Sequence, residues 1–460
     1  MSSTSIAAAE PMTLEDAQVL ALESGPIRGH TLKVLLVGDA PDRSPLPALC
    51  DVVESGLEVL PRWRRHLVPA PGTPAGLAWQ DDPRFRVDRQ VREVGGGAVD
   101  EAGLRRIVAA VMTDALDRSE PLWTLDVVPR LTDGRWALIW KVHHCLADGM
   151  TIMHAGSRLI WASSPSGTPE SAGGGAAAGA GPPTGADPGR PPAGRRPAPG
   201  LPAQLRAGAR LARAAGYRGL ALREFGPLGR LSPLAAPVGG RRVVAFARCE
   251  LADLHRIGRA STPHATVNDV LLAAVAGALR NWLLTRGPGT AIKAEVPVSM
   301  HHGPVAAEAA GNRDSFLLVG LPVREPDPLA RLHAVSAATG LRKNRHDARA
   351  VYALGRAAAR APSPVRRLVQ HLVHSPHEYS LNVSNVPGPR TPVYVLGRRV
   401  DGLCSIAEVA PRHALRVAAV SLAGTLFVGL CADPGAMSDV DGFARDVELE
   451  VGTLLDATGA

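Results

Sequence analysis

The sequence of 460 residues predicts an α/β protein with mixed (α+β) sheets, built from two halves. Short apolar runs with strand alternation, such as residues 30–37, alternate with segments of helical periodicity, such as residues 101–116. Residues 163–200 then consist almost entirely of Gly, Ala, Pro and Ser, and such a segment cannot bury a core. We therefore expect an N-terminal half over residues 11–162, a disordered linker over residues 163–200, and a C-terminal half over residues 201–460.

In the N-terminal half, strands and helices are expected to alternate. Thr13 is a suitable cap for a first helix, because Asp16 then falls at the third helical position. The pair Asp133-Gly134 between two apolar runs predicts an antiparallel hairpin. The expected strands cover residues 30–37, 87–94, 123–128 and 136–144, and the further helices cover residues 46–60, 101–116 and 150–161.

The C-terminal half shows the same kind of alternation. Thr266 can cap a strongly apolar helix with Asp269 in the capping-box position, Pro297 is expected to end a strand, and Ala423-Gly424 marks a hairpin. The expected strands cover residues 243–249, 291–296, 316–323, 379–386, 415–421 and 425–431. The expected helices cover residues 251–259, 266–280, 328–339, 351–361, 365–374 and 440–455.

The charge of the chain favours anionic partners. The formal net charge is +8, and nearly all basic residues are arginines. Acidic lipid or a phosphorylated cofactor suits this balance, whereas nucleic acid does not, because only 4% of the residues are aromatic and no basic recognition helix or zinc-ligand spacing is present. The five cysteines form no Cys-x-x-Cys pair, which indicates reduced thiols rather than a disulfide framework.

We expect a cytoplasmic protein that is soluble or peripheral to a membrane. Residues 1–10 lack the basic start and apolar core of a signal peptide, and no uncharged apolar run reaches the roughly 18 residues of a spanning helix. Residues 201–225 place Arg206, Arg210 and Arg213 close together on a helical wheel. This segment fits either contact with an anionic membrane or a solvated helix.

The string His143-His144-Cys145-Leu146-Ala147-Asp148-Gly149 follows an apolar run that begins at Trp136. Strand alternation places His144 and His143 on opposite faces, so the two imidazoles cannot do the same work. An imidazole has an unperturbed pKa of about 6.5, which suits a general base acting on an alcohol near neutral pH. A buried histidine pair that only packs is the alternative, but the spacing to Asp148-Gly149 and the end of a strand favour chemistry at His144.

Other segments accompany this motif in a fixed order: Pro121-Leu122-Trp123, Asn268-Asp269, Gly311-Asn312-Arg313 and Asn385-Val386-Pro387-Gly388-Pro389. With the His-His-x-x-x-Asp-Gly string they resemble the segments of bacterial wax ester synthase/diacylglycerol acyltransferases, over residues 11–455 without the linker. The histidine motif alone is shared with chloramphenicol acetyltransferases, plant acyltransferases and peptide-synthetase condensation domains. The plant-type string Asp-Phe-Gly-Trp-Gly is absent.

The resemblance implies a two-domain, chloramphenicol-acetyltransferase-like fold with an active-site tunnel between the halves. Acyl-CoA and a long-chain alcohol or diacylglycerol would meet in the tunnel, and the product would be a wax ester or triacylglycerol. In this scheme His144 is the general base, His143 is a packing or hydrogen-bonding neighbour, Asp148 orients the loop by pairing with an arginine, and Gly149 leaves room for substrate. Neither a metal nor a permanently bound cofactor is required, and Cys145 is a small apolar filler.

Several roles stay open at the level of the sequence. Trp123, Asn268, Asp269, Asn312 and Asn385 are candidates for shaping the tunnel or binding the oxyanion, although capping explains Asp269 equally well. Arginines would contact the CoA phosphates, and the inner membrane face or lipid inclusions would be the peripheral location. Two alternative functions remain: a condensation-type enzyme with a specialised acceptor or a carrier-bound donor, and a non-catalytic lipid-binding paralogue.

Overall fold

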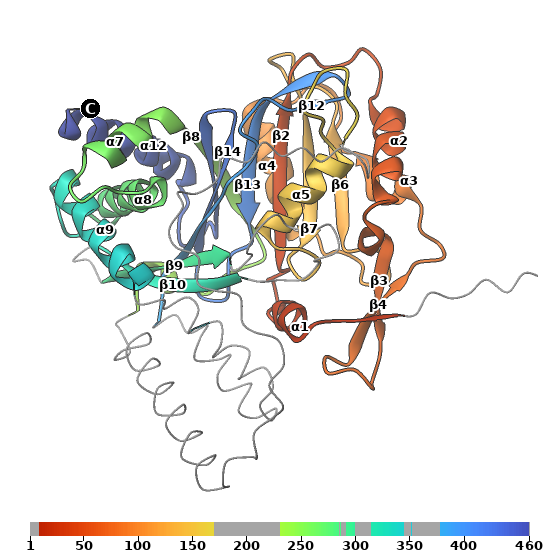
Figure 1. Ribbon diagram of the computed structural model, residues 1–460, viewed down its shortest axis with the longest axis horizontal. Coiled ribbons are helices and arrows are strands. Elements are labelled where there is room, and N and C mark those ends of the chain that lie inside the picture. Colours follow the sequence, from red (N-terminus) through yellow and green to blue (C-terminus); the bar gives the residue numbers. More distant parts are fainter. Residues whose placement is uncertain are drawn as a thin grey trace, which may run out of the picture.

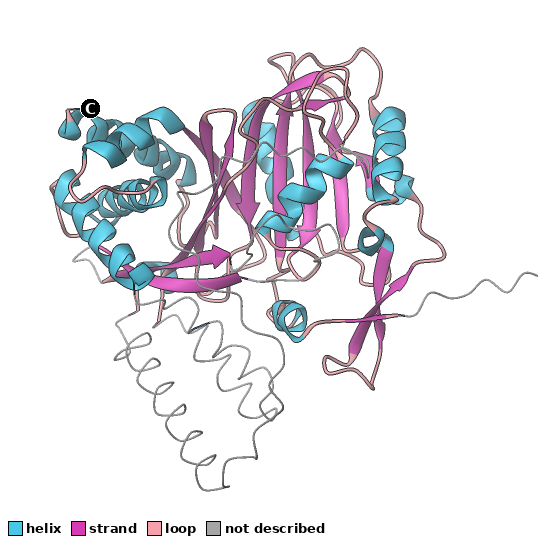
Figure 2. Cartoon of the chain, viewed as in Figure 1, coloured by secondary structure: helices cyan, strands magenta, loops and turns pink. Residues whose placement is uncertain are grey.

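The computed structural model describes residues 9–169, 231–284, 286, 291–299, 314–344, 351 and 378–459. Two six-stranded sheets form the centres of two halves that lie side by side (Figure 1). The helices of the C-terminal half gather on the outer side of its sheet, whereas helices lie on both sides of the N-terminal sheet (Figure 2). This is the mixed α/β, two-domain architecture that the sequence predicts.

The N-terminal sheet has the strand order β12-β13-β2-β7-β6-β5. Strands β2, β7 and β6 are antiparallel and almost completely buried, and short β5 runs parallel to β6. The elements of this half are β2 (His30–Val37), α2 (Leu46–Leu57), α3 (Val87–Gln90), β5 (Val91–Glu93), α4 (Glu101–Thr113), β6 (Trp123–Val128), β7 (Trp136–His143) and α5 (Gly149–Leu159).

A small three-stranded sheet with the order β1-β4-β3 lies beside the N-terminal sheet. Helix α1 follows β1, and its Thr13 cap accepts a hydrogen bond from the Asp16 amide at 3.0 Å, which confirms the predicted cap. The elements are β1 (Glu10–Pro11), α1 (Leu14–Leu20), the 3₁₀ turn η1 (Pro61–Arg64), β3 (Arg65–Pro69) and β4 (Leu77–Asp81). The sequence analysis did not predict this sheet, because its strands are short and only partly buried.

The C-terminal sheet has the strand order β10-β9-β11-β14-β15-β8. Every second residue of its strands packs into a core with the helices described on the outer side. The elements are η2 (Pro233–Ala235), β8 (Val243–Glu250), α7 (Leu251–Ala260), α8 (Val267–Leu284), β9 (Ile292–Ser299), β10 (Asp314–Leu321), α9 (Pro328–Asn344), β11 (Leu381–Val386), β14 (Leu415–Leu422), β15 (Thr425–Ala432) and α12 (Val440–Thr458).

Helix α8 is the central helix of this half. By length and mean hydropathy (1.2) it is the one helix among the described residues that could cross a membrane, but 72% of it is buried inside the protein. Its start has the predicted capping box: the Asp269 carboxylate accepts hydrogen bonds from the Thr266 amide and hydroxyl at 2.8 and 2.7 Å. The other carboxylate oxygen accepts one from Thr339 of α9 at 2.6 Å, which ties the two helices together.

Two strands of the C-terminal half leave their own sheet. Strand β13 (Arg398–Ala407) pairs antiparallel with β2 of the N-terminal sheet, and β12 (Tyr394–Val395) pairs with β13 at the edge. Strand β13 also crosses the C-terminal sheet so closely that a Cβ atom on Gly429 would lie 2.0 Å from the Ser405 carbonyl oxygen. The sheets are therefore joined by exchanged backbone pairing and by direct packing.

Most of the expected elements are confirmed, and two differ. Residues 87–90 form a helical turn, so the strand expected over 87–94 is only β5. Pro297 lies inside β9 rather than ending it, because β11 pairs with β9 only at Ala294 and Glu295 and leaves one side of the strand without a ladder at Pro297. Strand β13 was not expected. Residues 170–200 of the linker, residues 201–225 and the helices expected at 351–361 (beyond Val351) and 365–374 lie outside the described residues.

Candidate active site

The two adjacent histidines lie where strand β7 ends. His143 is the last residue of the strand, and His144 belongs to the turn that follows. The His143 amide donates to the Leu122 carbonyl and the His144 amide donates to the Gly29 carbonyl, each at 2.9 Å. The strand alternation that was expected to run to His144 is therefore wrong by one residue, because the chain already turns there. The two side chains still differ in environment: His143 is buried and His144 is half-buried.

Both ring nitrogens of His143 are engaged. Nδ1 accepts the Cys145 amide at 3.0 Å, so the ring proton lies on Nε2, which donates to Glu23 Oε1 at 2.7 Å. Glu23 also accepts from Arg118. Burial raises the pKa of Glu23, but its hydrogen bonds with His143 and Arg118 outweigh burial and leave the pKa below its usual value. His143 is thus held in the turn by hydrogen bonds at both ring nitrogens.

The segment opposite the turn, Gly29-His30, leaves room for the His143 ring. Gly29 has φ of +68°, and a Cβ atom there would lie 3.0 Å from His143 Nε2, so only glycine fits without strain. The His30 ring meets the His143 ring edge to face at 5.7 Å. Burial, followed by electrostatic interactions with His143 and Lys141, lowers the pKa of His30 to about 3. His30 is therefore neutral at physiological pH.

Asp148 is the N-terminal cap of helix α5. Its backbone is extended, its side chain is completely buried, and Oδ1 accepts the Thr151 amide at 2.9 Å. A carboxylate at this position also interacts favourably with the helix dipole. The predicted role of Asp148 was to orient the loop by pairing with an arginine, and this role stays a prediction beside the backbone cap.

Gly149, the first residue of α5, touches the other half of the protein. A Cβ atom at Gly149 would lie 2.8 Å from Val386 Cγ2, at the end of β11. The sequence analysis assigned Gly149 to making room for substrate, but the atoms next to it are those of Val386. The histidine motif therefore lies at the boundary between the two halves.

The remaining candidates occupy different environments. Trp123 lies beside Val142 of β7, but its indole is buried, donates to the Trp63 carbonyl at 2.7 Å and packs edge to face on the Trp63 ring. Asp269 serves the capping box described above. Asn268 is half-buried beside it, and Asn385 is half-buried next to Val386. Asn312 and the second histidine pair, His301-His302, lie outside the described residues.

Cys145, which follows the histidines, is not equipped to act as a nucleophile. The side chain is fully buried, and burial raises the pKa of its thiol well above the usual value, so the reactive thiolate is not formed. Within the part of the chain that the structure describes, no group of three or more His, Cys, Asp or Glu side chains is arranged to hold a metal ion.

Sequence reasoning did not find two residues of the site, Glu23 and Gly29, and it did not predict the contact of Val386 with Gly149. Glu23 lies 120 residues before its partner His143, and Val386 lies in the other half of the chain. No local pattern marks such contacts, because they depend on which strands pair. Gly29 directly before a predicted strand was the one available signal.

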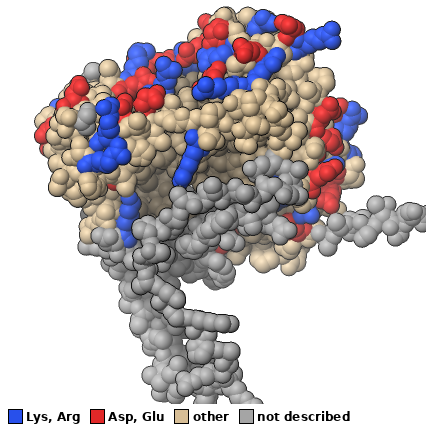
Figure 3. Space-filling model, turned by 45° about the horizontal axis from the view of Figure 1, so that its top comes forward, with Lys and Arg blue, Asp and Glu red and all other residues tan. Residues whose placement is uncertain are grey.

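Figure 3 shows one face of the molecule, on which basic and acidic side chains are interspersed along the upper edge and only isolated basic side chains lie on the surface below it. Many of the arginines are neutralised locally, as in the ion pairs Arg65–Asp81, Arg86–Asp88 and Arg105–Glu101. The positive net charge therefore does not form one continuous basic surface on this face, as a nucleic-acid-binding protein would need.

Comparisons with known proteins agree on one family. A model of the wax ester synthase/diacylglycerol acyltransferase catalytic domain matches residues 12–271, and a model of the C-terminal domain of that family matches residues 310–454. A Mycobacterium tuberculosis protein described as a probable diacylglycerol O-acyltransferase is 30% identical over 435 residues, which cover 92% of this chain and 90% of the relative. A second protein of that organism with the same description is 31% identical and covers 81% of this chain and 82% of its own.

Solved structures support the fold. The wax ester synthase/diacylglycerol acyltransferase from Marinobacter aquaeolei has a TM-score of 0.70 at 21% identity, covering 98% of this chain and all of the other. The first condensation domain of the CDA synthetase has a TM-score of 0.61 at 16% identity, covering 98% and 97%. Both likenesses are to the fold, and they match the two-domain architecture described above.

Proposed function

Because the chain belongs to the wax ester synthase/diacylglycerol acyltransferase family, we propose that it moves a fatty acyl group from acyl-CoA to the hydroxyl of a long-chain alcohol or diacylglycerol, with His144 as the general base. One observation carries the assignment to His144. His144 lies half-buried in the turn at the boundary between the halves, directly after His143, whose buried ring is fixed in the turn by Glu23 and Cys145.

The proposed reaction needs one proton carrier. His144 accepts the hydroxyl proton while the alcohol oxygen attacks the thioester carbonyl carbon, and the tetrahedral oxyanion then collapses with cleavage of the carbon–sulfur bond. The proton on His144 neutralises the departing CoA thiolate. The buried thiol of Cys145 takes no part, so no covalent acyl-enzyme forms.

The substrates are proposed to meet in a tunnel between the halves. Support comes from Gly149, whose contact with Val386 brings the histidine motif of one half against β11 of the other. A bulky or apolar acceptor held there would be shielded from water, which favours transfer over hydrolysis of the thioester. Asn385, next to Val386, remains a candidate for binding the oxyanion.

We also propose that the protein is cytoplasmic and associates peripherally with the inner membrane face or lipid inclusions, where its acceptor lipids reside. The net charge of +8 suits an anionic lipid surface. Flotation of the purified protein with vesicles containing anionic lipid, compared with neutral vesicles, tests this. Equal recovery in both bottom fractions would contradict the proposal.

The function is tested by CoA release from palmitoyl-CoA, with hexadecanol, diolein or no acceptor in parallel. We expect release that depends on the acceptor, and His144→Ala should reduce it at least about 100-fold without unfolding the protein. His66→Ala, which removes a half-buried imidazole from β3, is the matched control and should keep wild-type activity.

The outcomes separate the alternatives. Wild-type turnover in His144→Ala would reject His144 as the base. If the wild-type protein releases no CoA above the His144→Ala level with any acceptor, the fatty-alcohol and diacylglycerol assignment fails, and a carrier-bound donor, a specialised acceptor or a lipid-binding role takes its place.

A further inference from the structure

Lys33 is a buried lysine near the boundary between the halves. It lies in the middle of β2 with 2% of its surface exposed, and its Nζ donates to Ser405 Oγ on β13 at 2.6 Å. An ammonium group has three N–H donors, and this hydroxyl occupies one of them. Among the described residues, no carboxylate forms an ion pair with Lys33. The positive charge is therefore poorly compensated by the protein.

Arg416 supplies a second cation close to Lys33. It lies on β14, which β13 crosses, and its side chain is half-buried with Nε fully buried and without a hydrogen-bond partner. Burial, followed by the charge of Arg416, lowers the pKa of Lys33 to about 8. Arg416 likewise has no ion pair within the described chain. Two cations held together in a largely buried region, neither in an ion pair with a carboxylate, are costly unless an anion joins them.

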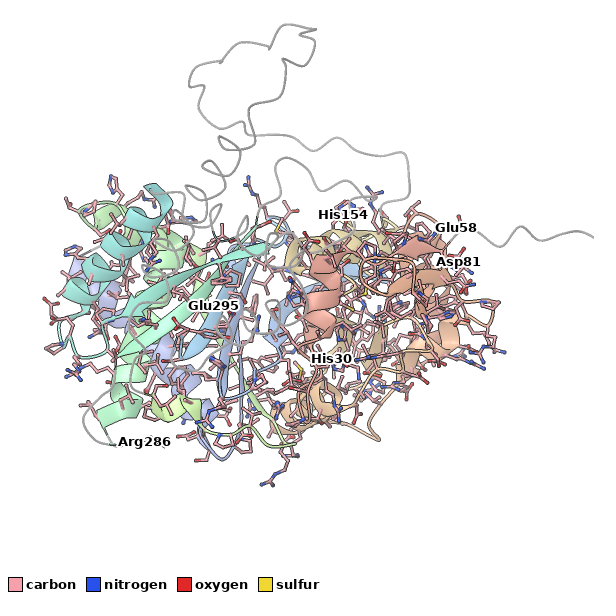
Figure 4. All side chains as sticks on the ribbon, turned by 90° about the horizontal axis from the view of Figure 1, so that it is seen from below. His30, Glu58, Asp81, His154, Arg286 and Glu295 are labelled. Atoms are coloured by element: carbon pink, nitrogen blue, oxygen red, sulfur yellow. The ribbon has the colours of Figure 1, made fainter. Side chains whose placement is uncertain are left out.

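Asn382 extends this cluster across the C-terminal sheet. It is in register with Arg416 on β14 and with Glu295 on β9. Its Nδ2 donates to Glu295 Oε2 at 2.8 Å, so Asn382 separates that carboxylate from Arg416. Its Oδ1 is buried and has no hydrogen-bond partner. Figure 4 shows Glu295 on the inner part of the C-terminal half, toward the side on which His30 of the N-terminal half lies.

The cluster lies at a defined distance from the histidine turn. Lys33 is four residues along β2 from Gly29, whose carbonyl binds the His144 amide, and this corresponds to about 13 Å of extended strand. On β11 of the other half, Asn382 is likewise four residues from Val386, which packs against Gly149. Strands β2 and β11 therefore both lead from the histidine turn to the cations.

We propose that Lys33, Arg416 and Asn382 form a subsite for the anionic end, a carboxylate or a phosphate monoester, of an acceptor whose hydroxyl lies at His144. Lys33 and Arg416 bind the anion through charge-assisted hydrogen bonds, and Asn382 Oδ1 accepts an N–H or O–H near that end. The inference rests on the proposed function. The ester bond forms at the acceptor hydroxyl, the thioester carbon–sulfur bond breaks, and the product retains its anionic group.

The test measures binding to the full chain carrying His144→Ala, so that no turnover occurs. The first probe pair is 10-hydroxydecanoate and methyl 10-hydroxydecanoate, which share length and hydroxyl and differ in charge. The second pair is 1-oleoyl lysophosphatidate and 1-oleoylglycerol, which tests phosphate as the source of the anion. In at least one pair, we expect the anion to bind about tenfold or more tightly than its neutral partner by equilibrium dialysis.

Variants assign the preference to the subsite. Lys33→Met and Arg416→Leu, each added to His144→Ala, should abolish the preference for the anion. Lys141→Met is the matched control, because Lys141 is also a buried lysine, lies on the neighbouring strand β7 and points to the other face, where it donates to the Asp114 carbonyl at 3.1 Å. It should keep the preference. If Lys33→Met does not fold, Arg416→Leu still tests the subsite, because Arg416 is only half-buried and its replacement should be tolerated.

Equal binding of anion and neutral partner in both pairs overturns the subsite, as does a loss of preference in Lys141→Met equal to that in Lys33→Met. If the wild-type protein transfers palmitate to hexadecanol but neither anionic probe binds more tightly than its neutral partner, the subsite is rejected and the proposed function is kept. A preference that depends on Lys33, together with no transfer from palmitoyl-CoA to any acceptor, keeps the subsite and rejects the proposed function.

Discussion

The Nε2 atom of His143 lies 2.7 Å from Oε1 of Glu23. The opposite ring nitrogen accepts the Cys145 amide, so the carboxylate and the amide together fix the orientation of the ring. His143 thereby links the loop after α1 to the turn that carries His144. Glu23 acts on the proposed chemistry through this link and is a positioning residue.

Replacing Glu23 by leucine is expected to lower the free energy of unfolding by about 1 kcal/mol at pH 7, a modest loss because Glu23 is partly exposed. The kcat for palmitoyl transfer should fall about tenfold with little change in KM, because the turn loses its support. Urea unfolding and steady-state kinetics measure the two effects.

The stability that Glu23 contributes is expected to decrease at low pH. The pKa of Glu23 is lowered in the folded protein, so its stabilisation is complete above the usual value of 4.5 and is lost as the pH falls through the folded value. The stability difference between wild type and Glu23→Leu should therefore shrink below pH 4.5. Glu120→Leu, which removes a surface carboxylate facing Arg89, is the control, and an equal effect there would argue against the positioning role.

His30 is expected to make the protein sensitive to mild acid. Its folded pKa of about 3 lies below the usual 6.5, so the unfolded chain binds the proton first and stability falls as the pH drops below about 6.5. Each further pH unit costs up to about 1.4 kcal/mol until the folded pKa is reached. Urea unfolding at pH 7, 6 and 5 should show a smaller decline for His30→Gln than for wild type, and parallel declines would refute the assignment.

Asp148→Ala is expected to lose stability as well as activity. The side chain caps α5 and is completely buried, so removing it should cost about 2 kcal/mol, at the upper end for helix caps. Asp148→Ser retains an oxygen for the Thr151 amide and should recover part of the loss. Thermal unfolding of both variants checks this, and equal Tm values for the two would show that capping is not the cause.

Gly149→Ala is expected to destabilise the boundary between the halves by about 1–3 kcal/mol, because the new Cβ atom would lie 2.8 Å from Val386 Cγ2. Val386→Ala removes the atoms in the way. The double variant should therefore lose less stability than the sum of the two single variants. Urea unfolding of all four proteins measures the coupling, and strict additivity would mean that the two residues do not meet.

Much of the fold follows from local patterns in the sequence. Residues 30–37 and 123–128 alternate or remain apolar between clear breaks, and they form β2 and β6 with the predicted bounds. Ala423-Gly424 turns the hairpin of β14 and β15 as expected, and both residues have positive φ angles of 46° and 96°. His144 could be named as the candidate general base because its spacing to Asp148-Gly149 is local, and this role stays a prediction.

What could not be predicted depends on pairing between distant segments. The turn at His144 begins where the His144 amide donates a hydrogen bond to the Gly29 carbonyl. The sequence around neither residue indicates that the two are partners. Pro297 stays inside β9 because of where the neighbouring strand β11 pairs. The contact of Gly149 with Val386 could not be predicted, because Val386 lies more than 200 residues later and arrives only through the folded C-terminal sheet.

The pairing of β13 with β2 has a consequence for how this protein is made. During synthesis, β2 emerges early but remains an open sheet edge until Arg398–Ala407 has left the ribosome. The N-terminal sheet thus cannot be completed by N-terminal sequence alone, and its final strand closes a loop that spans most of the chain. The order of translation and the order of folding therefore differ, and the turn that carries His144 reaches its final surroundings only when nearly the whole polypeptide is available.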